Sequence, residues 1–136
     1  MKVLRSVASI VVSYAVVFVL VLISDPILNR LFPGQAAPGK IPPTLVLEIS
    51  TAIFAVASIL GGWLCVRLAP ANTSLHLLIL FILGEIAGAI PAFINWNNGW
   101  PHWYPISWLL AWPICLWIGG LGRRTGTRTA VAVGAD

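Results

Sequence analysis

A chain of 136 residues in which 59% are hydrophobic and only 9% charged differs from soluble domains, where about 25% of residues carry a charge. This composition excludes a soluble globular domain and indicates an integral membrane protein. The net charge of +4 predicts no nucleic-acid partner, because the basic residues of membrane proteins lie beside anionic lipid headgroups as topology signals.

Four apolar stretches follow one another along the chain, each long enough for a bilayer-spanning helix of about 20 residues. They cover about residues 6–24, 44–68, 75–94 and 103–121. We therefore predict an all-α fold, a four-transmembrane-helix bundle that forms a single integral membrane domain over residues 1–136. Lys2 and Arg5 precede the first stretch, as a basic n-region precedes the apolar core of a secretory signal. The apolar core here is longer than that of a typical signal, and no small-x-small cleavage site follows it, which favours a retained anchor helix.

The basic residues indicate the orientation of the spans, because the cytoplasmic side retains Lys and Arg. With the N-terminus inside, only Arg30 and Lys40 lie outside. The cytoplasmic basic residues are then Lys2, Arg5, Arg67, Arg123, Arg124 and Arg128. This bias predicts that both termini are cytoplasmic, which agrees with an even number of spans.

The connections between the spans differ in character. Residues 25–43 contain five prolines and are expected to form an extended, irregular outer loop. Residues 69–74 predict a tight cytoplasmic turn in which Ser74 caps the third span. Residues 95–104 form the last outer loop, which is rich in Trp and Asn. Its aromatic rings favour an interfacial belt over a ligand-binding platform, since indole rings prefer the headgroup region.

Glu85 stands in the middle of an otherwise uncharged run from Leu77 to Ile94. A carboxylate near the bilayer midplane costs roughly 2.5 kcal/mol or more on insertion scales, so such a residue faces protein or water, or carries a proton. No Lys or Arg is expected at its depth, and desolvation without a cation favours the neutral acid, which can donate one hydrogen bond. Depth counting brings four polar residues towards this level: Ser58, Tyr14, Ser13 and Trp112.

Small residues predict which helix faces meet inside a membrane, because they let two backbones approach closely. On the third span, Gly84, Gly88 and Ala92 lie on or beside the face that carries the carboxyl group. On the second span, Gly62 belongs to another stripe of small residues. A short turn makes consecutive helices antiparallel neighbours, so we predict that these two stripes pack against each other.

Two functions stay open for such a chain. The leading hypothesis is a small multi-pass membrane protein without enzymatic activity, an accessory subunit that packs with itself as a homo-oligomer or within a larger membrane complex. The alternative is a proton-coupled carrier of a small solute that uses Glu85. A carrier requires a water-accessible cavity that reaches Glu85, whereas a packing subunit requires that this residue be buried among side chains.

The sequence predicts no enzyme, no cofactor and no metal site. His76 and His102 are expected near opposite membrane surfaces, so one metal or haem cannot use both within a monomer. Cys65 and Cys115 lack a CxxC or metal-ligand spacing. The chain contains no Gly-rich phosphate loop, nucleophile elbow or acid–base pair.

The second span ends in GGWLCVRLA, residues 61–69, and a short turn leads from it to His76. In this GG-x-x-x-x-R-L-A pattern the chain resembles the small, uncharacterised four-helix membrane proteins of bacteria. The resemblance covers the central third of the chain. It implies four spans and a location in the bacterial inner membrane, and it implies no activity.

Overall fold

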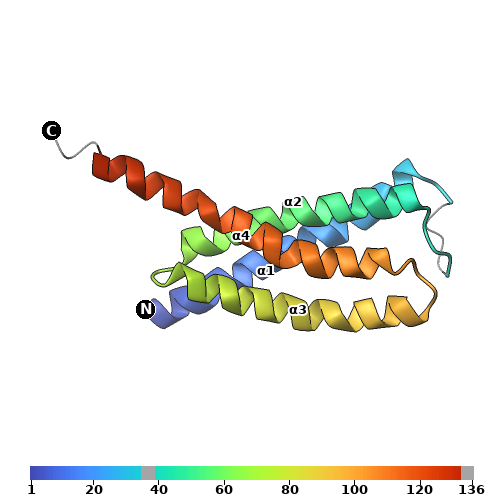
Figure 1. Ribbon diagram of the computed structural model, residues 1–136, viewed down its shortest axis with the longest axis horizontal. Coiled ribbons are helices and arrows are strands. Elements are labelled where there is room, and N and C mark those ends of the chain that lie inside the picture. Colours follow the sequence, from blue (N-terminus) through green and yellow to red (C-terminus); the bar gives the residue numbers. More distant parts are fainter. Residues whose placement is uncertain (35–38, 133–136) are drawn as a thin grey trace.

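The computed structural model describes residues 1–34 and 39–132, with side chains described as far as Gly122. Within this part the regular structure is entirely helical, and its helices are α1 (Lys2–Leu31), α2 (Thr44–Leu68), α3 (Thr73–Asn97) and α4 (Trp103–Ala132). They run in alternating directions along a bundle, so the start of α1 and the end of α4 lie at the same end (Figure 1). Each helix contains a stretch long and apolar enough to cross a membrane. The predicted all-α fold with four such helices is thereby confirmed.

The first helix is longer than predicted, because residues 25–31 continue it instead of opening an irregular loop. Pro26 removes one backbone hydrogen bond within α1 without ending the helix. Leu28 is only 4% exposed, and its packing on the bundle outweighs the single lost hydrogen bond. Asp25 is therefore a helical residue rather than a loop residue.

The sequence predicts that Ser74 caps the third span, but the structure contradicts this. Helix α3 begins at Thr73, so Ser74 lies inside it. Asn72 occupies the cap position with φ +46°, in the left-handed region that Asn adopts more readily than most residues. The carbonyl group of Asn72 accepts the backbone N–H of Leu75 at 2.9 Å. The tight turn between α2 and α3 requires this backbone conformation, and it places the helix start ahead of Ser74.

The fourth helix begins at Trp103, the first residue of the predicted span. It continues to Ala132, past the predicted end at residue 121, because a helix satisfies its own backbone hydrogen bonds in lipid and in water alike. The apolar part that could cross a membrane ends at Gly122. The side chains of Arg123, Arg124 and Arg128, which the sequence assigns to the cytoplasmic side, lie outside the described part.

Helix α4 lies between α2 and α3 (Figure 1), and its contacts with α2 are the most extensive in the bundle. Glycines bring these two backbones together. A Cβ atom added to Gly62 would overlap the carbonyl oxygen of Leu116 on α4. A Cβ atom added to Gly119 would likewise overlap the carbonyl oxygen of Ile59 on α2. The prediction that the stripe of Gly62 packs against the third span is therefore wrong, because α4 occupies that face of α2.

Candidate functional site

Glu85 lies in the middle of α3 and is half-buried. Its Oε1 atom is buried and has no hydrogen-bond partner within the described part of the chain. Most buried polar atoms in proteins are hydrogen-bonded, because an unpaired polar group forfeits the bonds that it makes in water. An unpaired, buried carboxyl oxygen is thus a group available to a proton or to a cationic ligand.

A cavity of about 280 Å³ lies between the four helices and reaches Glu85. Along α1 its wall extends from Tyr14 to Asp25, a distance of about 16 Å at roughly 1.5 Å per residue. All four helices contribute side chains to the wall, among them Asp25 and Tyr14 of α1, Phe54 of α2, and Tyr104 and Trp112 of α4. These positions place the cavity in the half of the bundle nearer the connection between α1 and α2.

Two of the four polar residues that depth counting placed near Glu85 do not line the cavity. Ser58 is fully buried, and its Oγ donates to the carbonyl oxygen of Phe54 at 2.7 Å. Ser13 is also fully buried, and its Oγ donates to the carbonyl oxygen of Ser9 at 2.6 Å. Both hydroxyl groups thus satisfy carbonyls within their own helices, the bonding pattern that serine favours inside a helix.

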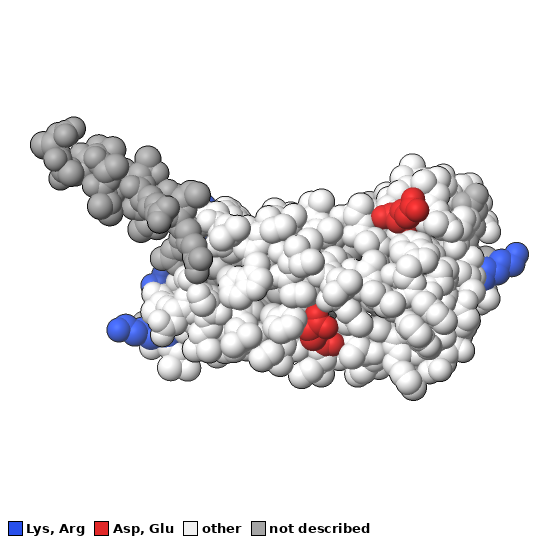
Figure 2. Space-filling model, viewed as in Figure 1, with Lys and Arg blue, Asp and Glu red and all other residues white. Residues whose placement is uncertain are grey.

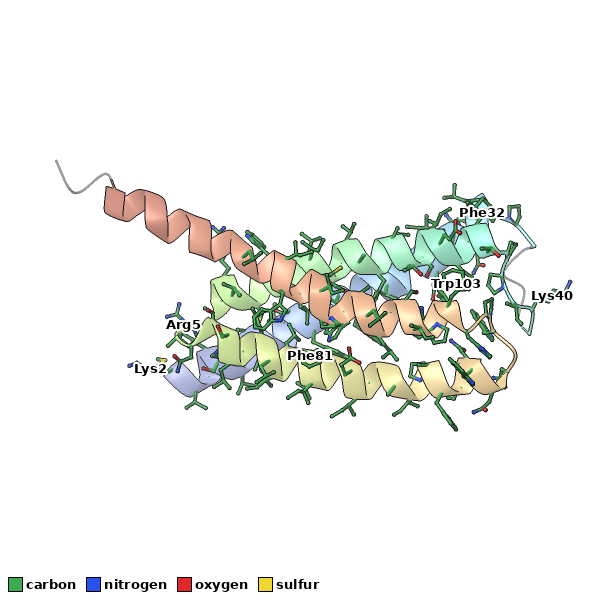
Figure 3. The ribbon with its side chains drawn as sticks, in the orientation of Figure 1. Lys2, Arg5, Phe32, Lys40, Phe81 and Trp103 are labelled. Carbon is green, nitrogen blue, oxygen red and sulfur yellow. The ribbon has the colours of Figure 1, made fainter. Side chains whose placement is uncertain are left out.

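The other two predicted residues, Tyr14 and Trp112, both line the cavity. The Nε1 of Trp112 donates to the carbonyl oxygen of Phe81 at 3.1 Å, which ties α4 to α3; Phe81 is labelled on α3 in Figure 3. The ring of Trp112 also meets the ring of Tyr14 edge to face, with centroids 6.5 Å apart. Trp112 also stacks on Phe54 of α2 and therefore contacts all of the other three helices.

The small residues of α3 differ in what they do. A Cβ atom added to Gly84 would overlap the indole of Trp112, so the absence of a side chain at Gly84 makes room for that ring. A Cβ atom added to Gly88 would lie 3.7 Å from Cδ2 of Leu109, an ordinary contact. Ala92 is buried with 7% of its surface exposed. Gly84 and Gly88 both line the cavity, and Gly84 is the one whose missing side chain makes room for Trp112.

Asp25 is a cavity residue that sequence reasoning assigned to a loop. It is exposed and lines the cavity at the end of the wall away from Tyr14. The sequence did contain a signal, since Tyr14, Phe18 and Asp25 recur at helical spacing and share one face of α1. Treating Pro26 as the point where the helix ends concealed this pattern.

Two pairs of hydroxyl groups connect α2 to α4 beside the cavity. Ser50 Oγ lies 3.4 Å from the hydroxyl oxygen of Tyr104. Thr51 Oγ1 lies 3.5 Å from Oγ of Ser107. Ser50, Thr51 and Tyr104 all line the cavity, so its wall offers neutral polar groups in addition to the two carboxyl groups.

The cavity is acidic. Its described lining residues include the carboxyl groups of Asp25 and Glu85 and no Lys, Arg or His. Basic side chains lie at the ends of the bundle, where Figure 3 labels Lys2 and Arg5 at one end and Lys40 at the other. On the face drawn in Figure 2, the acidic side chains lie along the length of the bundle between its ends, and the basic side chains lie at the ends. This charge distribution suits a proton or a cation and opposes an anion.

The described residues contain no group of three or more His, Cys, Asp or Glu side chains that could hold a metal ion. His76 lies near the start of α3, whereas the ring of His102 stacks on Trp96 at the other end of that helix, with centroids 3.9 Å apart.

No family model, curated protein or solved structure matches the chain. The chemistry of the cavity is therefore the ground for a functional proposal.

Proposed function

We propose that this protein is a proton-coupled carrier of a small solute, in which Glu85 takes up and releases the proton. The observation that carries the proposal is the cavity of about 280 Å³, which reaches a mid-helix carboxyl group with a buried, unpartnered Oε1 atom in the described part of the chain. Ionisable residues inside a membrane that face a cavity commonly mark ion or proton pathways. A carboxyl group that served helix packing alone would be expected to make a hydrogen bond to a neighbouring helix.

The backbone near Glu85 supports the same role. Pro91 lies within α3 and has no N–H, so the carbonyl group of Ala87 lacks its usual helical donor. Ala87 and Pro91 both line the cavity. The freed carbonyl group therefore belongs to a residue of the cavity wall, and a membrane protein tolerates such a group beside a cavity.

A role as an accessory subunit, in a homo-oligomer or a larger membrane complex, is the competing proposal. In that case a second chain would have to supply a donor to Oε1 of Glu85, because the described residues of this chain supply none. Such a contact would bury the carboxyl group away from water. The two roles therefore differ in whether the Glu85 proton exchanges with solvent.

Infrared spectroscopy of the protein in lipid nanodiscs tests this difference. We expect a carboxylic acid C=O band that loses intensity as the pH rises and that shifts in D₂O, because a carrier requires that its cavity connect Glu85 to water. Glu85→Gln should abolish the band. Glu48→Gln should leave it intact, since Glu48 is an exposed residue near the start of α2. A Glu85 band that responds neither to pH nor to D₂O would favour the accessory subunit.

The proposed location is the bacterial inner membrane, with the lipid bilayer as the constant partner and both termini in the cytoplasm. The support is the excess of basic residues on one side of the four spans. Reporter fusions after Asp136, which lies outside the described residues, should be active on the cytoplasmic side. Fusions within residues 95–99 should be active on the outer side. The opposite pattern would reverse the orientation and place the cavity on the cytoplasmic half of the membrane.

A further inference from the structure

Aromatic rings make up much of the cavity wall. Phe54 and Trp112 are stacked with ring centroids 5.9 Å apart, and Tyr104 meets Trp108 edge to face at 4.7 Å. Phe18 stacks on Tyr14 at the third side of the wall, with centroids 6.5 Å apart. Aromatic faces carry negative electrostatic potential, and they bind organic ammonium groups when the cation lies within about 6 Å of the ring centroid.

The charged groups of the wall favour a cation, as its aromatic rings do. Asp25 is exposed at one end of the cavity, and Glu85 offers an unpartnered Oε1 atom farther along it. No described lining residue is basic. An anion would meet two carboxyl groups without a counter-ion, whereas a neutral solute would gain hydrogen bonds from them but no attraction between opposite charges.

The volume of the cavity limits the size of the solute. About 280 Å³ lies just below the range of roughly 300–1,000 Å³ that is typical of pockets for drug-sized ligands. A single ring joined to a small ammonium group suits this space. A metal ion would leave most of it empty, and the described residues include no cluster of ligands to hold one.

We infer that the solute is a small organic monocation with an aromatic or apolar body, which binds in the cavity as Glu85 loses its proton. This inference rests on the proposed carrier function. In the step, the O–H bond of the Glu85 carboxylic acid breaks, its proton passes to water, and the resulting carboxylate pairs with the entering cation. The net charge of the occupied cavity is then the same as that of the empty one, because one positive charge replaces another.

The titratable groups that share the cavity with Glu85 are few. Tyr14 and Asp25 face it from α1, and Tyr104 faces it from α4. The residues that α2 contributes to the wall, which include Ser50 and Phe54, carry no titratable group. Asp25 is the exposed one of these groups, so Asp25→Asn separates attraction of the cation from exchange of the proton.

Binding of benzyltrimethylammonium to the purified protein in nanodiscs tests the inference. The uncharged control is neopentylbenzene, in which carbon replaces the ammonium nitrogen, and the anionic control is phenylmethanesulfonate. Tryptophan fluorescence reports occupancy, because Trp108 and Trp112 line the cavity. A pH dye in weak buffer reports the proton. We expect the cation to bind about tenfold or more tightly than either control and to release about one proton per molecule bound.

Variants assign the effect to the cavity. Glu85→Gln should abolish proton release and weaken binding of the cation by about tenfold or more. Asp25→Asn should weaken binding of the cation, but each bound cation should still release about one proton. Glu48→Gln, an exposed carboxyl outside the cavity, should behave as the unchanged protein.

Three results would overturn the inference. They are cation binding that Glu85→Gln leaves undiminished, equal binding of either control compound, and no binding of the cation at all. In each case a pH-sensitive and exchangeable infrared band of Glu85 would leave the carrier proposal standing. A silent infrared band together with tight cation binding would overturn the carrier and keep a cation site.

Discussion

Gly62→Ala and Gly119→Ala should each destabilise the bundle by about 3 kcal/mol or more, at or above the upper end of the usual cost of overpacking. The added methyl groups would overlap the carbonyl oxygens of Leu116 and Ile59, respectively. Both obstacles are backbone atoms, which cannot rotate away as a flexible side chain can. Helices α2 and α4 would have to separate, and their interface is the most extensive in the molecule.

Gly88→Ala is the matched control for these two changes. It introduces the same methyl group in the interior of a helix, but the new Cβ would lie 3.7 Å from Cδ2 of Leu109. Alanine also favours the helix by about 1 kcal/mol relative to glycine. Unfolding in mixed detergent micelles, followed by circular dichroism, measures all three variants. Equal stability of Gly119→Ala and Gly88→Ala would mean that α2 and α4 do not approach as closely as described.

Glu85→Gln should reduce proton-coupled uptake in proteoliposomes to the level of protein-free liposomes. Glutamine keeps the size and the hydrogen-bonding capacity of a neutral glutamic acid but cannot exchange a proton. The variant should therefore fold and insert normally while losing its coupling. The measurement imposes a pH gradient and follows labelled benzyltrimethylammonium inside the vesicles together with the internal pH.

Further substitutions at the same position separate chemistry from structure. Glu85→Asp keeps an exchangeable proton and should retain part of the uptake. Glu85→Leu removes the polar group altogether and should lose uptake; a packing role would make its main effect a loss of roughly 1 kcal/mol of interhelical hydrogen bonding. Full uptake by Glu85→Gln would show that the proton does not travel through this carboxyl group, and the carrier proposal would then fail.

The apolar helices and their number could be predicted from the sequence. A membrane span is recognised from its own run of about 20 apolar residues, because contact with lipid depends on the composition of each segment. Glu85 could be found in the same way, since a charge inside an apolar run is visible without tertiary information. The end of α1 could not be placed, because the packing of Leu28 carries the helix past Pro26.

The surroundings of Glu85 were predicted only in part. Tyr14 and Trp112, which depth along the bundle placed near Glu85, line the same cavity as Glu85. It also selected Ser13 and Ser58, whose hydroxyl groups donate to carbonyls of their own helices instead. Depth follows from position in the sequence, whereas the rotation of each helix about its axis depends on the neighbour that it meets.

The sequence by itself determined that the chain forms four apolar helices and that one of them carries a carboxyl group at its middle. Only the tertiary structure decided which helices are neighbours. Gly62 of α2 and Gly119 of α4 are far apart in the chain, and neither helix alone indicates that their backbones meet. That contact places α4 between α2 and α3 and leaves the space that Glu85 and Asp25 share. A cavity is the volume that packed helix faces fail to fill, so it depends on all four helices at once.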